Sequence, residues 1–389
     1  MTDFPALTIV RKASRRLHPW VFSNEVRRVD GQPGPGDIVH VIEKGRLVGN
    51  AIYSPHSLIR ARLYSQDDRD LDAPLLIGRI RTAWRLRQAW LNREQDCRLV
   101  FGESDGLPGL TIDKYGNHFA VQVYAAGMEC RLDLITAALR EVFSAESVFA
   151  RNDISLRVHE GLERYERLLY GSLPEGVTLS ENGVVFQADI RSGQKTGFYF
   201  DQRLNHARVR VLSPDRTVLD VFCYTGGFAV NAALGGAGHV LAIDSSASAC
   251  GAVRVNSRLN QMEQKVEVLC ADAFEALRKL NQEHRRFDLV IVDPPPFARG
   301  RLDRRPAMAG YRDVNLQAMK LLNPRGFLLT CTCSHHVSWS DLTEFLIEAS
   351  QACGRSFRIV ERLKQSPDHP LLLHMPESEY LRSYLLQLV

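Results

Sequence analysis

Four consecutive apolar stretches in the second half of this 389-residue chain are each predicted to carry an aspartate at or near their carboxyl end. The aspartates are Asp220, Asp244, Asp272 and Asp293, in the stretches 217–222, 239–244, 265–272 and 287–293. The carboxyl ends of parallel strands meet at one edge of a sheet, where folds of this kind bind ligands. A single aspartate at such a place is usually a helix N-cap. Four of them along one edge favour a polar ligand site instead.

The glycine turn that follows the first stretch, in TVLDVFCYTGGF at residues 217–228, narrows the nature of the ligand. The turn lacks the GxGxxG spacing of dinucleotide-binding proteins, and it has no lysine or Ser/Thr placed as in a nucleoside-triphosphate loop. Asp244 is placed to bind both ribose hydroxyls of an adenosine, and Asp272 comes next along the edge, near an adenine. An adenosyl cofactor without phosphates, S-adenosylmethionine, fits these features.

Asp293 opens the sequence DPPPF, in which three prolines precede Phe297. Prolines fix the backbone and supply no N–H donors. The Asp293 carboxylate and nearby carbonyls are therefore left to hold a flat polar group, such as a nucleic-acid base, against Phe297. A plain strand-ending turn is the alternative interpretation.

Two cysteines follow on the next predicted strand, 326–333, in the sequence TCTCS. Cys331 and Cys333 share a strand face, and Cys333 lies nearer the carboxyl edge. We expect Cys331 to be an inert buried thiol and Cys333 to be a nucleophile. A thiolate that adds to carbon 6 of a pyrimidine activates carbon 5 for methylation, and a base must then remove the carbon 5 proton. The target base must be flipped out of folded RNA to reach the thiol.

The elements that would position these residues form three predicted domains. Residues 1–72 contain short alternating strands typical of a small antiparallel barrel, and residues 73–190 are predicted to form a central α+β domain with an irregular stretch after Gly161. Residues 191–389 alternate apolar strands with helices, which predicts a doubly wound parallel sheet of the Rossmann-like type. The predicted fold class is therefore α/β.

The composition excludes several classes of protein. Of the residues, 45% are hydrophobic and 24% are charged, and no apolar run is long enough to span a membrane. The amino-terminal residues do not have the pattern of a signal peptide, so we expect a cytoplasmic protein. The eight cysteines form no CxxC pair, which favours reduced thiols and no metal site. The net charge of +4 is compatible with a polyanionic partner.

Two arginine-rich segments could contact such a partner. The segment Arg11–Trp20 is basic with an aromatic residue beside it, and either a solvated face or a phosphate contact explains it. The loop Arg299–Arg312 has five arginines and directly follows DPPPF, which favours RNA phosphate binding.

Six blocks of the sequence point to one known family. They are HPWVFS (18–23), GESDGLPG (102–109), QKTGFYFDQR (194–203), FCYTGGF (222–228), VDPPPF (292–297) and TCTCS (330–334). These blocks resemble the 23S ribosomal RNA cytosine-5 methyltransferases of the RlmI type. The resemblance implies a PUA-type RNA-binding barrel, a central α+β domain and a class I methyltransferase domain. It also implies 5-methylcytosine as the product, in 23S ribosomal RNA or the assembling large subunit, and it leaves a homodimer open.

The resemblance also implies roles for individual residues. Cys333 matches the nucleophile of the family, and Asp293 is assigned to both the catalytic and the cofactor-binding residues. The other cofactor-binding residues that it implies are Tyr199, Gln202, Asp220, Tyr224, Gly226, Asp244 and Asp272.

The chain departs from the family pattern at the proline turn. Pro296 stands where a lysine is common, and no second cysteine follows the proline pair, so another residue must remove the carbon 5 proton. Glu377 is a candidate for this base. His335 and His336 could assist Cys333 or could cap the next helix.

Two other functions stay open at this point. One is methylation of a ring nitrogen or an exocyclic amine of RNA, which would not need the thiol. The other is a non-catalytic RNA-binding protein of ribosome assembly whose cofactor site is vestigial. A nicotinamide dehydrogenase is disfavoured because GxGxxG is missing.

Overall fold

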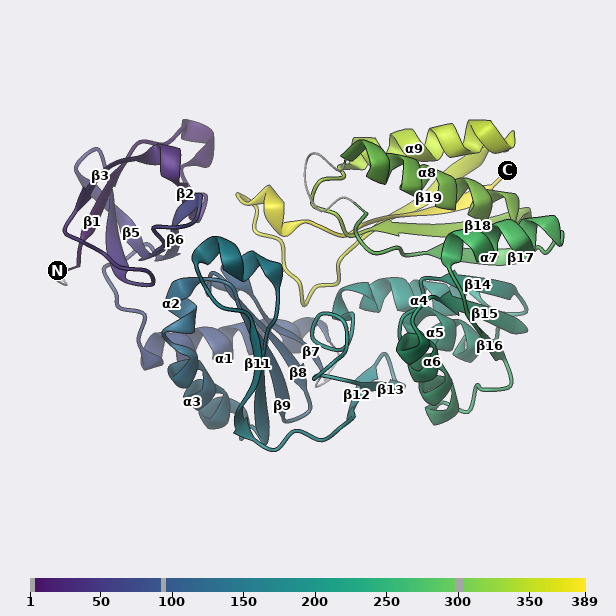
Figure 1. Cartoon of the computed structure of the whole chain (residues 1–389), viewed down its shortest axis with the longest axis horizontal. Helices are drawn as coiled ribbons and strands as arrows, with labels where there is room; N and C mark the ends of the chain where they lie inside the picture. Colours follow the sequence, from purple (N-terminus) through teal and green to yellow (C-terminus); the bar gives the residue numbers. More distant parts are fainter. Residues whose placement is uncertain (1–3, 92–95, 298–303) are drawn as a thin grey trace. The chain divides into compact units, whose positions relative to one another are not determined.

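The computed structural model describes residues 4–91, 96–297 and 304–389. The chain divides into two compact units (Figure 1). The first unit comprises Met1–Leu179, Ala188–Phe200 and Pro367–Ser378, and the second unit comprises Ser180–Gln187, Asp201–Ser366 and Glu379–Val389. Each unit is therefore assembled from segments that are distant in the sequence.

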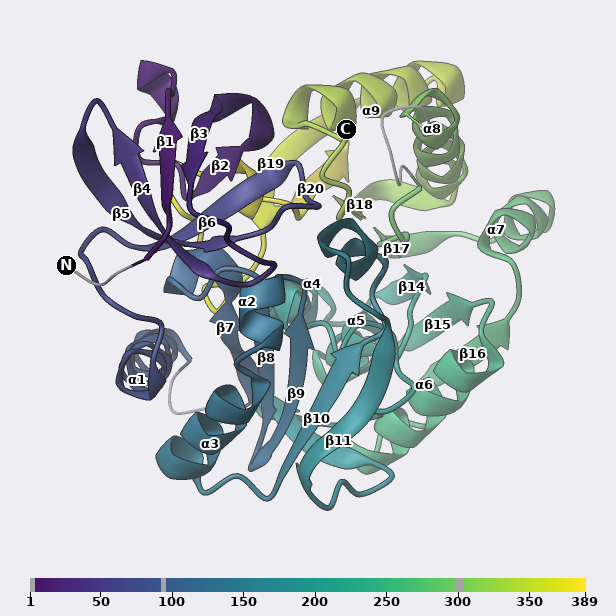
Figure 2. The same ribbon diagram turned by 60° about the vertical axis from the view of Figure 1, so that its left-hand side comes forward.

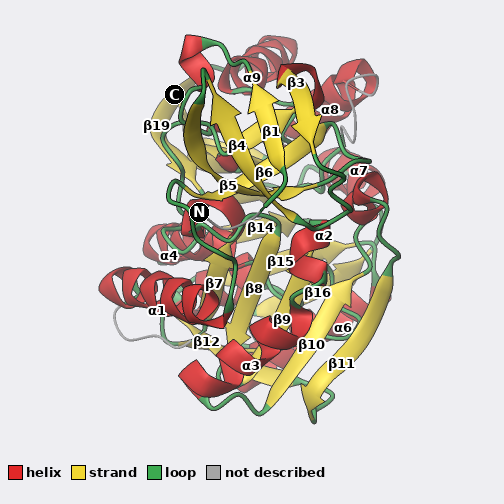
Figure 3. Cartoon of the chain, turned by 90° about the vertical axis from the view of Figure 1, so that its left-hand side faces the viewer, coloured by secondary structure: helices red, strands yellow, loops and turns green. Residues whose placement is uncertain are grey.

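The amino-terminal part of the first unit is a six-stranded sheet in the order β2-β6-β5-β4-β1-β3. Figure 3 labels β1, β3, β4, β5 and β6 of this sheet. Its strands are β1 Ala6–Ile9, β2 Trp20–Phe22, β3 Val26–Asp30, β4 Ile38–Glu43, β5 Arg46–Tyr53 and β6 Ile59–Ser65. Leu7, Val21 and Val39 are fully buried in its core. Neighbouring strands are antiparallel except β1 and β4, which run parallel. The predicted antiparallel arrangement therefore contains one parallel pair.

The central part of the first unit is a five-stranded sheet in the order β11-β10-β9-β8-β7. Its strands are β7 Cys97–Phe101, β8 Leu110–Tyr115, β9 His118–Val123, β10 Ser147–Asn152 and β11 Tyr165–Gly171. Its helices are α1 Ala73–Trp90, α2 Ala126–Glu129 and α3 Leu132–Phe143. The buried side chains of Ile80 on α1 and Leu139 on α3 share one core with Ile112 and Val121 of the sheet. Strand β11 lies in the stretch that we predicted to be irregular, so that prediction was wrong.

The chain passes from the first unit into the second through a two-stranded hairpin. The hairpin consists of β12 Val177–Glu181 and β13 Val184–Ala188. The residues Ser180–Gln187 belong to the second unit, and the chain then returns to the first unit for Ala188–Phe200.

The second unit contains a seven-stranded sheet in the order β16-β15-β14-β17-β18-β20-β19 (Figure 2). Its strands are β14 Thr217–Val221, β15 His239–Asp244, β16 Val266–Cys270, β17 Phe287–Val292, β18 Leu322–Thr332, β19 Phe357–Lys364 and β20 Arg382–Leu388. The pairs from β16 to β18 are parallel, and β20 is antiparallel to both its neighbours. The strand order reverses between β14 and β17, which makes this the switch point where such sheets bind ligands. The predicted α/β class with a Rossmann-like sheet is confirmed.

Helices cover both faces of this sheet. They are α4 Arg203–Leu212, α5 Gly227–Leu234, α6 Ala247–Leu259, α7 Ala273–Gln282, α8 Arg304–Lys320 and α9 Trp339–Cys353. Leu219 and Val221 of β14 pack into one core with α7, α8 and α9, whereas Val218 packs into another with α5 and α6. Because successive strand residues face opposite sides, Asp220 shares the face of Val218.

The predicted arginine-rich loop is described only in its second half. Residues 298–303 lie outside the described part of the chain, and helix α8 begins at Arg304. No helix in the described ranges is long and apolar enough to cross a membrane. Within those ranges, no group of three or more His, Cys, Asp or Glu side chains could hold a metal ion. All eight cysteines are free thiols.

Candidate functional site

The turn between β14 and α5 has an unusual backbone conformation. Phe222, Tyr224 and Gly226 have φ angles of 66°, 46° and 84°, in the left-handed region that residues with a side chain rarely adopt. Gly226 is the N-cap of α5, and a Cβ atom there would lie 3.1 Å from Cγ1 of Val253. The backbone of the turn therefore approaches α6 more closely than a larger residue would allow.

Asp220 lies within β14, where its side chain is fully buried. Its Oδ2 accepts a hydrogen bond of 3.0 Å from the backbone N–H of Ala229, in the first turn of α5, and its Oδ1 is buried without a partner among the described residues. Burial, followed by the negative charge of Asp293, raises the pKa of Asp220 to about 8, and the charge of Asp244 adds to this. The strand ends at Val221, one residue before the end of the predicted stretch 217–222.

The next two aspartates differ in what they do. Asp244 ends β15, and its carboxylate accepts hydrogen bonds from the backbone N–H groups of Tyr224 at 3.0 Å and Ser246 at 2.9 Å. Asp272 is exposed and is the N-cap of α7, where it accepts a hydrogen bond of 3.1 Å from the N–H of Glu275. Asp244 thus ties the glycine turn to the second strand, whereas Asp272 has the capping contact of an ordinary helix start.

Asp293 directly follows β17 and is half-buried. Its Oδ2 accepts a hydrogen bond of 2.8 Å from the side-chain amide of Gln202, and Oε1 of Gln202 accepts one of 2.5 Å from the amide of Asn205. Gln202 and Asn205 are both buried. The two amides therefore form a directed chain that orients the Asp293 carboxylate from the start of α4. We did not predict Asn205, although it lies three residues after Gln202, on the same side of the helix.

Cys333 directly follows β18, which pairs in parallel with β17. Its thiol is half-buried and lies 4.0 Å from the carbonyl oxygen of Pro294, whereas the thiol of Cys331 is buried. The thiol at the end of one strand and the carboxylate at the end of its neighbour are therefore brought to the same edge, as the sequence predicted.

Two of the predicted site residues, Tyr199 and Glu377, belong to the first unit and not to the second. Tyr199 belongs to the first unit, where its hydroxyl donates to Oε1 of Gln194 at 2.8 Å. Glu377 also belongs to the first unit, where its carboxylate lies 3.1 Å from Nε2 of His18.

The two histidines after Cys333 are exposed, and neither caps the next helix. Ser338 is the N-cap of α9, and it forms a capping box with Asp341. The capping interpretation of His335 and His336 is therefore wrong. The ring of His335 lies 5.6 Å from the ring of Tyr380.

The basic segment of the amino-terminal sheet is largely engaged in contacts within its own unit. Arg11 donates to the carbonyl oxygens of His18 and Trp20 at 3.0 and 3.2 Å, and Arg15 lies 3.4 Å from Glu25. Exposed cationic side chains remain at Lys12 and Arg16. Neither the solvated-face nor the phosphate interpretation accounts for Arg11.

The edge residues of the second unit suit a cationic adenosyl cofactor. Two carboxylates, Asp220 and Asp293, lie close enough for one to raise the pKa of the other, and an oxygen of Asp220 is buried without a partner. A positively charged ligand would offset the repulsion between the carboxylates.

Comparison with known proteins gives matches over the whole chain. Residues 151–377 match the S-adenosylmethionine-dependent methyltransferase family, and residues 10–66 match the PUA-like domain. The chain is 39% identical over 380 residues to Ribosomal RNA large subunit methyltransferase I of Vibrio vulnificus (strain YJ016), which covers 96% of both chains. It is 36% identical over 398 residues to the protein of that name from Klebsiella pneumoniae (strain 342), which covers 99% of both.

A solved structure gives the same fold. SMU.776, which was assigned as a methyltransferase and crystallised in complex with SAH, has a TM-score of 0.84 to this chain at 20% sequence identity. The match covers 98% of this chain and 99% of that one.

Proposed function

The chain belongs to the S-adenosylmethionine-dependent methyltransferase family, among the ribosomal RNA large subunit methyltransferase I proteins, and we propose that it methylates carbon 5 of a cytidine in large-subunit ribosomal RNA. The cofactor is S-adenosylmethionine. The observation that carries the proposal is the approach of the Cys333 thiol to the Asp293–Pro294 turn, at 4.0 Å from the Pro294 carbonyl oxygen. Both groups stand at the switch-point edge of the sheet.

Two of the residues proposed to hold the cofactor bond to the glycine turn or to the helix after it: Asp244 to Tyr224 and Asp220 to Ala229. When bound, the cofactor supplies an electrophilic methyl group on a positively charged sulfur. Asp244 would accept hydrogen bonds from ribose hydroxyls with the lone pairs that Tyr224 and Ser246 leave over. Asp220 and Asp293 would face the cationic end of the ligand. Gln202 and Asp272 are proposed to complete this binding site.

Cys333 is proposed to act as the nucleophile. Its thiolate forms a bond to carbon 6 of the cytosine and displaces the electron pair of the carbon 5–carbon 6 double bond. Carbon 5 becomes nucleophilic as a result and would take the methyl group. A base then removes the proton from carbon 5, the ring double bond re-forms, and the sulfur–carbon bond breaks to return the thiolate. Asp293, held by Gln202, would hold the polar edge of the cytosine during these steps.

Methylation of an exocyclic amine is a second candidate function, and the same turn favours it. The Asp293 carboxylate and the Pro294 carbonyl oxygen are both acceptors, and two acceptors suit the two hydrogens of an amino group. Such a reaction would not need the Cys333 thiol. The two functions therefore differ in a property that can be tested directly.

The test uses the whole protein, labelled cofactor and large-subunit ribosomal RNA, followed by nucleoside mass spectrometry. We expect the label in 5-methylcytidine, and label only in another nucleoside would contradict the proposal. RNA that contains 5-fluorocytidine should trap the protein covalently, because fluorine at carbon 5 cannot leave as a proton. Cys333→Ala should abolish trapping, whereas the matched control Cys331→Ala should retain it. Trapping that survives Cys333→Ala would exclude this residue as the nucleophile.

A further inference from the structure

We propose that Tyr311 is a positioning residue, whose hydroxyl group fixes the Asp293 turn and the Cys333 segment relative to each other. This proposal rests on the proposed function, because it concerns the geometry that a thiol addition requires. Tyr311 lies on α8, outside both segments. None of the blocks that indicate the family contains it.

The hydroxyl of Tyr311 contacts both segments at once. It accepts a hydrogen bond of 3.1 Å from Oγ1 of Thr332, the residue before Cys333, and its oxygen lies 3.4 Å from the backbone N–H of Phe297. Because the three residues after Asp293 are prolines, the N–H of Phe297 is the first backbone donor that the turn can offer. The Tyr311 oxygen therefore contacts the proline turn at the first backbone donor after the prolines.

The Cys333 segment is also held by its hydrogen bond to Tyr311, which Thr332 donates. Thr332 is fully buried, and its Oγ1 accepts a hydrogen bond of 3.4 Å from the N–H of Ser334. The backbone on both sides of Cys333 is thus linked to one hydroxyl, that of Thr332, which is in turn linked to Tyr311. A change at Tyr311 would reach the thiol through a single intermediate residue.

The ring of Tyr311 is held in place by packing. It is fully buried, and its centroid lies 4.7 Å from the ring of Phe297 and 5.4 Å from the ring of Phe345, with which it is stacked at 9°. A ring held between two others cannot follow small movements of the strand ends. Its hydroxyl is therefore a fixed point for the two segments rather than a mobile link.

Tyr311 is not suited to be the base that removes the carbon 5 proton. Burial raises the pKa of its hydroxyl to about 12, and the charges of Cys333 and Asp293 act in the same direction. The hydroxyl therefore stays protonated at neutral pH. Its influence on the reaction would come from geometry, because a misplacement of about 1 Å can slow an enzymatic reaction by about 10²-fold.

The experiment compares Tyr311→Phe with Tyr384→Phe, in the full-length protein. Both changes remove a buried tyrosine hydroxyl of the second unit, but that of Tyr384 bonds to Oγ1 of Thr343 on α9, at 3.0 Å. Single-turnover methylation of ribosomal RNA and trapping by 5-fluorocytidine RNA give the rates. Cofactor Kd, RNA KM and the unfolding temperature are measured in parallel.

We expect Tyr311→Phe to slow both rates by about 10-fold, with cofactor Kd and RNA KM within about twofold of wild type. Tyr384→Phe should lower the unfolding temperature comparably and leave both rates unchanged. Thr332→Val should slow the reaction as Tyr311→Phe does, and the double variant should be no slower than the slower single variant.

The outcomes separate this proposal from the proposed function. If wild type methylates RNA but is not trapped, the nucleophile is wrong and the proposal for Tyr311 falls with it. If wild type is trapped and Tyr311→Phe is trapped within twofold of the same rate, only the proposal for Tyr311 falls. A loss of rate that Tyr384→Phe reproduces would reduce Tyr311 to a structural role.

Discussion

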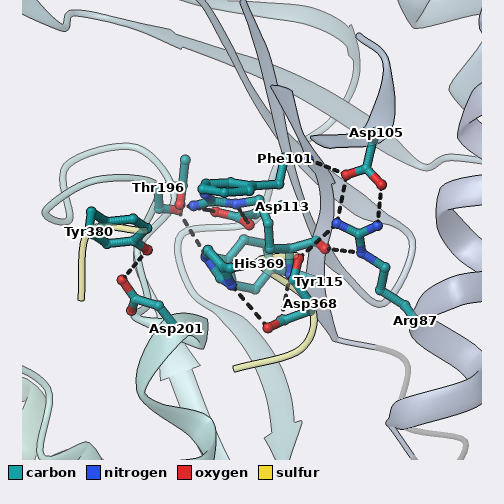
Figure 4. A network of polar contacts seen from close by, with 11 residues as sticks. Arg87, Phe101, Asp105, Asp113, Tyr115, Thr196, Asp201, Asp368, His369 and Tyr380 are labelled. Carbon is teal, nitrogen blue, oxygen red and sulfur yellow. Dashed lines mark hydrogen bonds and ion pairs between the residues drawn. The ribbon is translucent and has the colours of Figure 1, made fainter. Parts of the chain in front are cut away.

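Each unit buries a cluster of charged side chains, and the two clusters differ in the charges that surround them. In the first unit, Arg87 forms a two-pronged ion pair with Asp105, at 2.5 and 2.7 Å (Figure 4). Arg98 forms another with Asp113, at 2.5 and 3.0 Å. In the second unit, the nearest charges that act on buried Asp220 are those of two other carboxylates.

This difference distinguishes carboxylates that the fold pairs with an arginine from carboxylates that a positively charged ligand would stabilise. A buried ion pair with its hydrogen bonds made is complete in itself. The Arg87 guanidinium even uses its remaining donors on the carbonyl oxygens of Arg98 and Asp368. Carboxylates gathered at a strand edge raise the free energy of the folded protein until a cation or a hydrogen-bond donor joins them.

The largest effect is expected from opening an ion pair of the first unit. Arg87→Ala leaves Asp105 buried and unpaired, which should lower the free energy of unfolding by about 3–5 kcal/mol. Urea denaturation measures this change. The control is Arg81→Ala, because Arg81 pairs with Glu141 at an exposed site at 3.0 Å, and such pairs contribute about 1 kcal/mol or less. Equal losses in the two variants would mean that burial does not distinguish the two pairs.

Removal of a charge at the strand edge should lower the rate of methyl transfer rather than the stability of the fold. Asp293→Asn keeps an oxygen that can accept from Gln202 but removes the negative charge. We expect the rate of methyl transfer to fall by about 10²–10³-fold, which corresponds to about 3–4 kcal/mol of barrier, whereas the unfolding free energy should not fall, because the repulsion of Asp220 is relieved. Single-turnover methylation and urea denaturation measure the two quantities. Activity within tenfold of wild type would show that the turn needs only the hydrogen bond.

The sequence predicted those features of the site that depend on residues adjacent in the chain. The strand ends with Asp244 and Asp293 could be predicted because hydrophobic runs and the residues that end them are neighbours in the chain. The ion pair between Arg87 and Asp105 could not be predicted, because its members are 18 residues apart on different elements and leave no periodic pattern. The hydrogen bond from Arg87 to the carbonyl oxygen of Asp368 joins residues that are 281 positions apart.

Two errors in the predicted elements have physical causes. Strand β11 was missed because none of its residues is fully buried, so that its sequence lacks the clear alternation of buried and exposed positions that marks a strand. The arginines and Pro306 suggested a loop, but proline is tolerated in the first turn of a helix, and α8 begins at Arg304. Asn205 and Tyr311 act through contacts that only the folded chain assembles.

The pH dependence of stability should report on Asp220. Its pKa of about 8 in the folded protein lies above the value of 3.8 for a free aspartate. The folded protein therefore binds more protons between these values, and stability falls as the pH rises through this range. In the cofactor-free protein, the contribution of Asp220 between pH 6 and pH 8.5 is a loss on the order of 2 kcal/mol. Asp220→Asn, which can still accept from Ala229, should remove that loss in urea denaturation.

The outcome at Asp220 bears on function as well. The variant should be more stable than wild type at pH 8.5 and should bind S-adenosylmethionine less tightly, because the neutral amide no longer attracts a cation. An Asn variant with the wild-type pH profile would mean that Asp220 is not the group responsible.

The smallest change in unfolding free energy is expected at Asp272, where the question is whether the carboxylate only caps a helix or also contacts the cofactor. Asp272→Ala removes the bond to the N–H of Glu275 and should lower the unfolding free energy by about 1 kcal/mol, whereas Asp272→Ser keeps a capping oxygen and should lose only a few tenths. The matched control is Asp72→Ala, because Asp72 is also exposed and caps α1 through a bond of 2.9 Å to the N–H of Leu75.

If the Asp272 carboxylate also meets the cofactor, both Asp272 variants should weaken S-adenosylmethionine binding about threefold to tenfold by calorimetry, and Asp72→Ala should not. The serine variant is decisive, because it keeps an oxygen that can cap the helix but removes the negative charge. Wild-type affinity in Asp272→Ser would make Asp272 a cap alone. The boundary between structural and ligand-directed carboxylates would then lie within the strand edge itself, between Asp244 and Asp272, rather than between the two units.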